Sequence, residues 1–204
     1  MANLLHLSAF LTILLSFNAF AVDTDGDGFS DADEATLGTD PNDPTSPLEN
    51  KLTASDGANR DEFGWSVSID SDTAVIGARN DDDNGIESGS AYIFTRTNGE
   101  WTEQQKLTAS DGAAGHEFGY SVSLVADTIV ITAFGDDDNG PYSGSAYVFT
   151  RSNGTWMQEW KLIASDGNQY DAFGISASIA DETIIIGSYA DDENGQENSG
   201  SAYV

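Results

Sequence analysis

The sequence predicts an all-β fold of β-propeller-type blades, each built from four antiparallel strands, in three copies that form an incomplete propeller. The first observation is a repeat: Phe63-Gly64 returns as Phe118-Gly119 and Phe173-Gly174, at intervals of 55 residues. The second is a hairpin signal, because Asn98-Gly99 and Asn153-Gly154 separate two strand-like runs. No stretch of the repeat has the pattern of an amphipathic helix. Units of this size bury their apolar faces by stacking on their neighbours.

The first two copies each supply four strand-like runs, and the truncated third copy supplies fewer. In the first copy, Ser66-Val67-Ser68-Ile69 alternates polar and apolar side chains, which is typical of a β-strand. Residues 73–78 are continuously apolar or small, as in a central strand that is covered on both faces. Residues 90–94 form the third run, and residues 101–107 form the fourth, after the Asn-Gly pair. The same runs recur at 121–124, 128–133, 145–149, 156–162, 176–179 and 183–188.

The composition is strongly acidic. The 204 residues include 35 Asp and Glu against 7 Lys and Arg, which gives a formal net charge of −28. This charge repels phosphate backbones and makes nucleic acid a poor partner, whereas a cation is the natural counter-ion. The 39% apolar content is too high for a disordered acidic chain. Because cysteine is absent, the sequence excludes disulfides and thiolate metal sites.

Residues 1–21 are predicted to be a signal peptide. Residues 1–22 contain no Asp, Glu, Lys or Arg, and their one histidine, His6, is counted as neutral. Ala19-Phe20-Ala21 has the small-x-small pattern of a cleavage site. Cleavage after Ala21 would send the chain to the periplasm, the cell surface or the medium. The alternative is a retained membrane anchor, because the segment lacks the usual Lys or Arg at its start. No later segment is apolar enough to span a bilayer, so no membrane insertion is expected after cleavage.

The segment that follows, residues 23–34, predicts a calcium-binding loop. With Asp23 as position 1, acidic residues fall at positions 1, 3, 5, 9 and 12 and Gly28 at position 6, which is the ligand spacing of an EF-hand. A short exit helix is expected over residues 30–37. The alternative interpretation is an acidic, disordered linker. The predicted calcium ligands, with a backbone carbonyl at position 7, are Asp23, Asp25, Asp27, Phe29, Asp31 and Glu34.

This loop and its continuation resemble a known calcium-binding repeat. The stretch DTDGDGFSDADEATLGTDPNDPTS, over residues 23–46, resembles the bacterial thrombospondin type 3 repeat. The resemblance implies a semi-rigid spacer loaded with calcium, which we assign to residues 22–46. Pro41, Pro44 and Pro47 indicate that residues 47–50 form a stiff linker.

The 55-residue repeat resembles the FG-GAP repeat of integrin α-chain propellers, and most closely its bacterial branch. The resemblance rests on Phe63-Gly64, followed by Val75-Ile76-Gly77-Ala78 and then Gly89-Ser90-Ala91-Tyr92. It implies β-blades and leaves the ligand open. We assign the repeats to residues 51–105, 106–160 and a truncated 161–204.

Acidic loops after the second strand of each copy could also bind calcium. Counting the loop glycine as position 6 places Asn80, Gly135 and Ala190 at position 1, so two of the three copies lack the first ligand. The alternative interpretation is a solvated acidic turn that keeps the blade soluble. The candidate ligands are Asp82, Asn84, Asp137, Asn139, Asp192 and Asn194.

The sequence does not predict an enzyme. His116 is the only histidine after the leader, and no G-x-S-x-G motif is present. Aromatic residues that recur in every copy are expected in the blade core rather than on a sugar-binding platform: Phe63, Phe118, Phe173, Tyr92, Tyr147 and Tyr203. Trp101, Trp156 and Trp160, on the outer strands, are expected to pack in the same way, with a ligand-facing position as the alternative.

The functional hypothesis is a secreted or cell-surface calcium-binding scaffold for adhesion or interaction, with an extracellular protein or polysaccharide as its ligand. The rival hypothesis is a non-catalytic N-terminal part of a larger secreted hydrolase or carbohydrate-binding protein. Lys51-Leu52-Thr53-Ala54 corresponds to the tail of an outer strand, and the third copy stops before its own outer strand. An unpaired sheet edge, open to self-association, is therefore expected over residues 200–204.

Overall fold

The computed structural model describes residues 24, 32, 42, 51–192 and 195–204. The chain forms two compact units, residues 1–49 and residues 50–204. The predicted leader, the six ligands of the predicted calcium loop and the predicted linker lie outside the described residues. Ala32, which falls within the predicted exit helix, is helical. In the part of the chain that the structure describes, no helix has the length and apolarity needed to cross a membrane.

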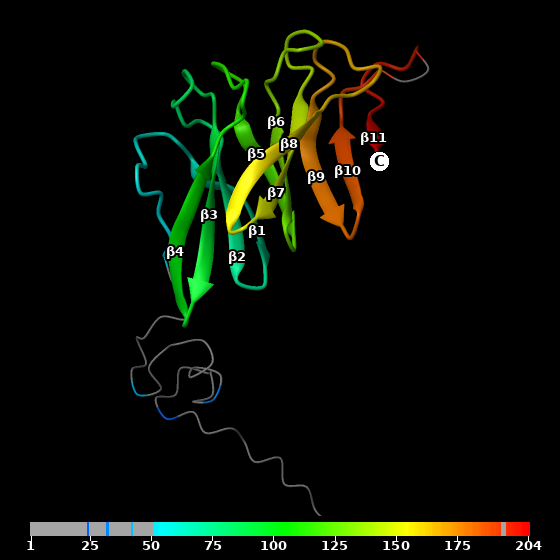
Figure 1. Ribbon diagram of the computed structural model, residues 1–204. Coiled ribbons are helices and arrows are strands. Elements are labelled where there is room, and N and C mark those ends of the chain that lie inside the picture. Colours follow the sequence, from blue (N-terminus) through cyan, green and yellow to red (C-terminus); the bar gives the residue numbers. More distant parts are fainter. Residues whose placement is uncertain (1–23, 25–31, 33–41, 43–50, 193–194) are drawn as a thin grey trace, which may run out of the picture. The chain divides into compact units, whose positions relative to one another are not determined.

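The second unit consists of three antiparallel sheets, which confirms the all-β prediction (Figure 1). The first sheet has the order β1 (Phe63–Asp70), β2 (Thr73–Ala78), β3 (Ser90–Thr97), β4 (Glu100–Leu107). The second has the order β5 (Phe118–Val125), β6 (Thr128–Ala133), β7 (Ser145–Ser152), β8 (Thr155–Leu162). The third has the order β11 (Ser201–Tyr203), β10 (Thr183–Ser188), β9 (Phe173–Ala180).

The local sequence explains these strands. In the first sheet, every residue of the central strand β2 is buried, as its continuous apolar run predicts. Asn98 and Gly99 connect β3 to β4 with φ angles of 53° and 86°. Both residues of a type I′ hairpin turn need positive φ, and Asn-Gly meets this need at the lowest steric cost. The hairpin predictions at Asn98-Gly99 and Asn153-Gly154 are both confirmed.

The three sheets follow one another in a row, because β1 contacts β5 and β5 contacts β9 (Figure 1). Serine side chains join these innermost strands: the Leu124 N–H donates to Ser68 Oγ, and the Ile179 N–H donates to Ser123 Oγ, each at 3.0 Å. The alternating pattern of these strands therefore places serines against the next sheet. The intervening apolar residues pack against the preceding sheet, where Val122 is 7% exposed.

A close backbone contact fixes each pair of sheets at one end. Gly89 forms an isolated parallel bridge with Phe118, and the Phe118 N–H donates to the Ser88 carbonyl at 3.0 Å. Gly89 has a φ of 81°, and a Cβ at this position would collide with the Phe118 backbone. Glycine is therefore required here both by conformation and by space. Gly144 repeats this contact with Phe173 between the second and third sheets.

The core lies between the sheets and is built from the recurring aromatic residues. Tyr92, Phe118 and Tyr147 are fully buried, and the Phe118 ring meets the Tyr147 ring edge-on at 5.4 Å between centroids. The prediction that these residues form the blade core is confirmed for the second sheet. At the two ends of the row, Phe63 and Tyr203 are only partly buried.

Candidate functional site

The same cluster of acidic and phenolic side chains occurs once in each sheet; we call it the aspartate–tyrosine cluster. Each contains one aspartate from the loop that precedes the first strand, one from the loop that follows the second strand, and one tyrosine from the third strand. The three sets are Asp56, Asp81 and Tyr92; Asp111, Asp136 and Tyr147; and Asp166, Asp191 and Tyr203.

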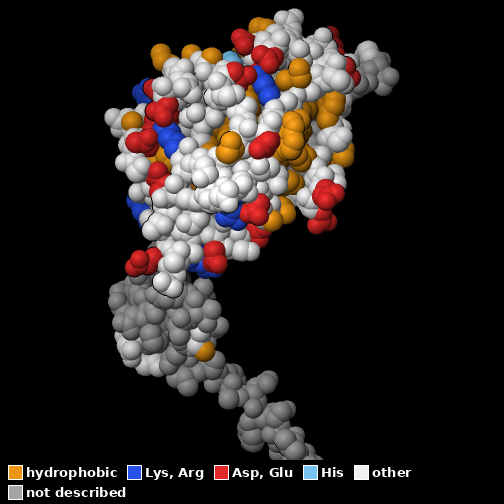
Figure 2. Space-filling view, viewed as in Figure 1, with side chains coloured by type: hydrophobic (Ala, Val, Ile, Leu, Met, Phe, Trp, Pro, Cys, Tyr) orange, Lys and Arg blue, Asp and Glu red, His pale blue; other side chains and the backbone are white. Residues whose placement is uncertain are grey.

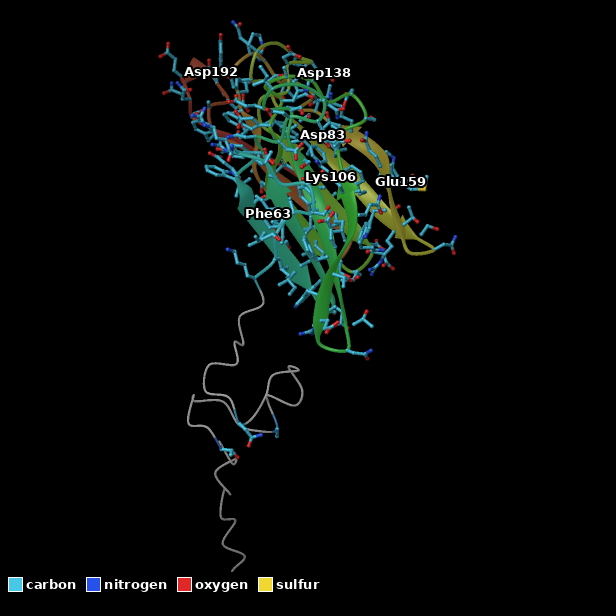
Figure 3. The ribbon with its side chains drawn as sticks, turned by 90° about the vertical axis from the view of Figure 1, so that its left-hand side faces the viewer. Phe63, Asp83, Lys106, Asp138, Glu159 and Asp192 are labelled. Carbon is cyan, nitrogen blue, oxygen red and sulfur yellow. The ribbon has the colours of Figure 1, made fainter. Side chains whose placement is uncertain are left out.

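In the first cluster, a lysine ammonium group occupies the centre. Lys106 Nζ, from β4, lies 2.8 Å from Asp56 Oδ2, 2.9 Å from Asp81 Oδ2 and 2.6 Å from Asp83 Oδ2. The Tyr92 hydroxyl lies 2.8 Å from Asp56 Oδ1 and 2.9 Å from Asp81 Oδ2. Figure 3 labels Lys106 and Asp83, whose side chains lie side by side. The ammonium group therefore supplies the cation that these carboxylates require.

The second cluster has the same geometry. Lys161 Nζ, from β8, lies 2.7 Å from Asp111 Oδ2, 2.8 Å from Asp136 Oδ2 and 2.7 Å from Asp138 Oδ2. The side chain of Asp136 is 0% exposed, and that of Lys161 is 18% exposed. Because an unpaired buried charge is costly, the close contact with Lys161 Nζ compensates the burial of the Asp136 side chain.

The electrostatics of these clusters favour the ion pairs at neutral pH. Burial acts to lower the pKa of Lys106, but hydrogen bonds to Asp56, Asp83 and Asp81 outweigh it, and the net effect raises the pKa of Lys106. The hydrogen bond from Lys106 is also the main cause that lowers the pKa of Asp56. Burial is the main cause that raises the pKa of Tyr92, so its phenol stays protonated. Lys161 shows the same direction of shift as Lys106.

The third cluster differs from the other two. The Tyr203 hydroxyl lies 2.9 Å from Asp166 Oδ1 and 3.0 Å from Asp191 Oδ2, as in the other sheets. Among the described residues, no lysine or arginine forms an ion pair with Asp166 or Asp191. In the first two sheets, the lysine comes from the outer strand, β4 or β8. The third sheet has no outer strand in the described chain.

The predicted blade-loop calcium ligands lie in three separate loops, and several of them accept or donate hydrogen bonds within the protein. Asp82 Oδ1 accepts a hydrogen bond from the Glu87 N–H at 2.8 Å, and Asp192 Oδ1 accepts one from the Asn198 N–H at 2.7 Å. The Asn139 side chain donates to the Ala164 carbonyl at 3.3 Å. Of the remaining candidates, the Asn84 backbone N–H donates to Ser88 Oγ, Asp137 lies beside His116, and Asn194 lies outside the described residues.

In the described part of the chain, no group of three or more His, Cys, Asp or Glu side chains is arranged to hold a metal ion. In the first two loops, the alternate residues Asp81 and Asp83, with Asp136 and Asp138, contact a lysine instead. Calcium binding by these loops stays a prediction. The same holds for Asp23 to Glu34, which lie outside the described residues.

A row of aromatic side chains, which the sequence did not reveal, includes residues of β1, of β5 and of the loops that precede β7 and β9. We call it the aromatic row: Trp65, Tyr120, Phe134, Tyr142 and Tyr170. Neighbouring ring centroids in this order are 5.8, 4.7, 5.7 and 6.3 Å apart. The Arg79 guanidinium covers the Trp65 ring at 3.6 Å from the centroid and pairs with Glu62 and Glu117.

The aromatic row is accessible to a ligand, because Trp65 is 47% exposed, Tyr142 45% and Tyr170 59%. The outer-strand tryptophans behave differently from one another. Trp156 is 2% exposed, so the packing expectation is confirmed there, whereas Trp160 is 58% exposed. Trp101 packs against the core of the first sheet.

Stacked antiparallel sheets, two of four strands and one of three in the described residues, define a β-blade repeat protein. The family model for the FG-GAP repeat matches residues 48–94, 101–149 and 156–204, and the chain belongs to this family. The model for the bacterial TSP3 repeat, the thrombospondin type 3 repeat, matches residues 23–44. Both resemblances noted in the sequence are therefore confirmed. A search of curated proteins found no match.

The family matches also limit the function. Bacterial TSP3 repeats are known to bind calcium, so this match implies calcium binding by the segment of residues 23–44. The matched families are non-catalytic repeats, and no catalytic domain was found. The second and third FG-GAP matches begin within the outer strands β4 and β8, and the first and second matches end within the third strands β3 and β7. The outer strand of one sheet and the inner strands of the next therefore belong to one unit.

Proposed function

We propose that the chain is an exported, calcium-binding scaffold that holds an extracellular ligand and acts in adhesion or interaction, with no catalysis of its own. Three features support this proposal: the predicted leader of residues 1–21, the TSP3 match at residues 23–44 and the three FG-GAP repeats. The observation that carries the interaction role is the aromatic row, which is exposed across all three sheets.

The aromatic row has the chemistry of a binding surface. Monomeric proteins rarely expose a contiguous patch of large apolar side chains unless it contacts a partner. Trp, Tyr and Arg, which form this row together with Phe134, are also the residue types that contribute most to binding energy. Because the rings of Tyr142 and Tyr170 stack on each other, they lose little freedom when a ligand covers them. An extracellular protein or a polysaccharide is the ligand class that we propose for this surface.

The same observation supports a second candidate function. Flat aromatic rings bordered by hydrogen-bonding side chains suit the apolar faces of sugar rings, as well as protein side chains. The chain would then act as the non-catalytic part of a larger secreted hydrolase or as a carbohydrate-binding protein. Sequence beyond Val204 separates the two, because further FG-GAP repeats favour the scaffold and a catalytic motif favours the hydrolase.

A binding assay tests the interaction role. The chain, purified from an exporting bacterial host, is titrated against immobilised polysaccharides and against intact bacterial cells. The double variant Tyr142→Ala/Tyr170→Ala is expected to lose at least about tenfold in affinity, because it removes two exposed anchors. Met157→Ala, which truncates a 58% exposed side chain on β8, is the matched control and should bind normally. Equal binding by both variants and the parent would contradict this role for the row.

We propose that calcium binds through Asp23, Asp25, Asp27, Asp31 and Glu34, with the Phe29 carbonyl completing the set. Calorimetry of the exported chain should show a Kd on the order of 10⁻⁴ to 10⁻³ M, as for extracellular calcium modules. Asp23→Ala and Glu34→Ala should each abolish most of the heat. Magnesium should bind poorly, because it demands a smaller octahedral site. Unchanged heats in both variants would refute this assignment.

A further inference from the structure

The only histidine after the predicted leader is a departure from the repeat, and it lies in the second of the three sheets. His116 stands where the other copies have Asp61 and Asp171. In those copies the carboxylate holds its own turn. Asp61 accepts a hydrogen bond from the Ala58 N–H at 2.5 Å, and Asp171 accepts one from the Asn168 N–H at 2.6 Å. Because a residue repeated in every copy serves the architecture, a change in one copy alone indicates a role that is particular to that copy.

We propose that His116 and Asp137 bind one divalent transition-metal ion of the zinc class, and that Asp136 accepts the other ring N–H of the histidine. Imidazole nitrogen and carboxylate oxygen are common zinc ligands, whereas calcium takes oxygen ligands. This ion differs in its chemistry and its place from the calcium predicted at residues 23–34. It would join the loop before β5 to the loop after β6, which carries Phe134 and Tyr142 of the aromatic row.

The orientation of the imidazole supports this assignment. The His116 side chain is 10% exposed, and its Nδ1 atom is buried without a hydrogen-bond partner among the described residues. Nδ1 faces Asp136 Oδ2 at 3.6 Å, which is longer than a hydrogen bond. A buried polar atom without a partner is uncommon and costs free energy. A metal ion on Nε2 would place the ring proton on Nδ1 and direct this N–H to the carboxylate, as is usual for metal-bound histidines.

The distance between the two candidate ligands fits a zinc ion. His116 Nε2 lies 3.5 Å from Asp137 Oδ1, which is also longer than a hydrogen bond. An ion about 2.1 Å from each atom would hold them at an angle of about 113°, close to the tetrahedral geometry of zinc sites. The two atoms are therefore too far apart to satisfy each other directly, and they are well spaced to share an ion.

Asp137 is the carboxylate of its loop that remains available for a metal. Asp136 and Asp138 contact Lys161 Nζ at 2.8 and 2.7 Å. Asp137 forms no ion pair with the described residues other than its contact with His116, and its side chain is 68% exposed. Figure 2 shows acidic side chains gathered over the loops at the top of the view, around the one histidine of the described chain. An ion in solution can therefore reach this pair.

The site has two protein ligands, so water would fill the other positions of the ion. The described residues contain no group of three or more His, Cys, Asp or Glu side chains arranged to hold a metal. Structural zinc sites use four protein ligands, so this ion should exchange with solution, and the sheets should fold without it. The equivalent pairs, Asp61 with Asp82 and Asp171 with Asp192, lack an imidazole. Only the second sheet should therefore select zinc over calcium.

A zinc titration followed at the histidine itself tests the site. His116 is the only histidine after residue 21, so the exported chain, labelled isotopically at histidine nitrogen, gives one set of imidazole signals. Excess calcium is kept present, so that the predicted calcium loop is occupied. Zinc chloride should shift the Nε2 signal until it saturates and leave a proton on Nδ1, whereas magnesium should change neither signal. An unshifted Nε2 signal, or metal bound at Nδ1, would overturn the proposal.

Matched variants separate this site from general binding to an acidic surface. In His116→Asn the amide oxygen can hold the turn as Asp61 and Asp171 do, so folding should be kept. Its zinc affinity in calorimetry should fall at least about tenfold, and Asp137→Asn should cause a similar loss. The control Asp82→Asn makes the same change at the equivalent position of the first sheet and should bind zinc like the parent. Equal zinc affinity in His116→Asn and the parent, or in Asp137→Asn and the parent, would overturn the proposal.

Discussion

The first two sheets and the third sheet share the same aspartate–tyrosine cluster but differ in what lies at its centre. Lys106 and Lys161 enter the first two clusters from the outer strands β4 and β8, whereas the third receives no lysine from the described chain. Lys106 follows Asp56 by 50 residues in the sequence. Closure of a sheet therefore depends on the start of the next repeat, as expected for proteins whose repeats are stabilised by their neighbours. The outer strand has two roles, since it pairs with the third strand and neutralises the loops.

The same difference extends to the core. In the second sheet, Ile129 and Ile131 are fully buried, and Phe149 and Trp156 cover the gap to the first sheet. In the third sheet, Ile184 is only partly buried and lines an open groove between the second and third sheets. In the described chain, the third sheet has three strands, and both charge and apolar area are uncovered beside them. We expect the third sheet to open locally at a lower free energy than the other two.

The largest expected effect comes from equivalent phenylalanines in a closed and an open sheet. Phe118 is fully buried and contacts the rings of Tyr147 and Phe149, so Phe118→Ala should lower the free energy of unfolding by about 3–5 kcal/mol. Phe173 contacts only Tyr203 among the described aromatic rings. Phe173→Ala should therefore cost less in global urea unfolding. Equal losses would show that the third sheet is as firmly packed as the second.

The lysine contact predicts a second difference, of about 2 kcal/mol. Asp136→Asn keeps the size of the side chain but removes the buried charge that faces Lys161, and a hydrogen bond to a charged group contributes about 1.5–3 kcal/mol. Asp191 contacts no lysine in the described chain. Asp191→Asn should therefore lower the free energy of unfolding by less than about 1 kcal/mol. Thermal and urea unfolding of the two variants measure this contrast directly. Similar costs would mean that Tyr203, and not a cation, is the main partner of Asp191.

The regular parts of this fold could be predicted from the sequence, because they depend on short-range patterns. The Asn98-Gly99 turn follows from two adjacent residues, and the buried strand β2 follows from its own apolar run. The recurring aromatics indicated the core, because a residue repeated in every copy serves the architecture of the unit. Phe118 and Tyr147 bear this out.

The lysine clusters could not be predicted, because their members lie far apart in the chain. The acidic loops were interpreted from local spacing alone, which suggested calcium, and that spacing contains no sign of Lys106. A repeated Lys in a repeated Asp-rich context was nevertheless a usable signal, since a buried aspartate needs a cation. The aromatic row could not be predicted either, because it has no repeated signal: Trp65, Phe134 and Tyr170 occupy positions that vary between copies.

Acid should destabilise the two closed clusters. Hydrogen bonds with Lys106 lower the pKa of Asp56; burial acts to raise the pKa of Asp111, but contacts with Lys161 and Tyr147 lower it overall. A carboxylate with a lowered pKa stabilises the fold above its ordinary pKa of 3.8 and loses that contribution as the pH falls below it. The free energy of unfolding should thus fall steeply below that pH. In the double variant Lys106→Met/Lys161→Met, the free energy of unfolding should fall less steeply with decreasing pH. The same dependence on pH in the variant and the parent would argue against the ion pairs.

The smallest expected effect is at Asp137, which tests whether the blade loops have any role beyond solvation. Its side chain is 68% exposed and its Oδ1 lies 3.5 Å from His116 Nε2, which is a weak contact in water. Asp137→Asn should therefore change the free energy of unfolding by less than about 0.5 kcal/mol, as for ordinary surface substitutions. Calorimetry with calcium is the decisive measurement. If Lys161 already neutralises this loop, the heat of calcium binding should be the same in the variant and the parent. Loss of a calcium-binding step in the variant would show that the loop holds calcium beside its lysine.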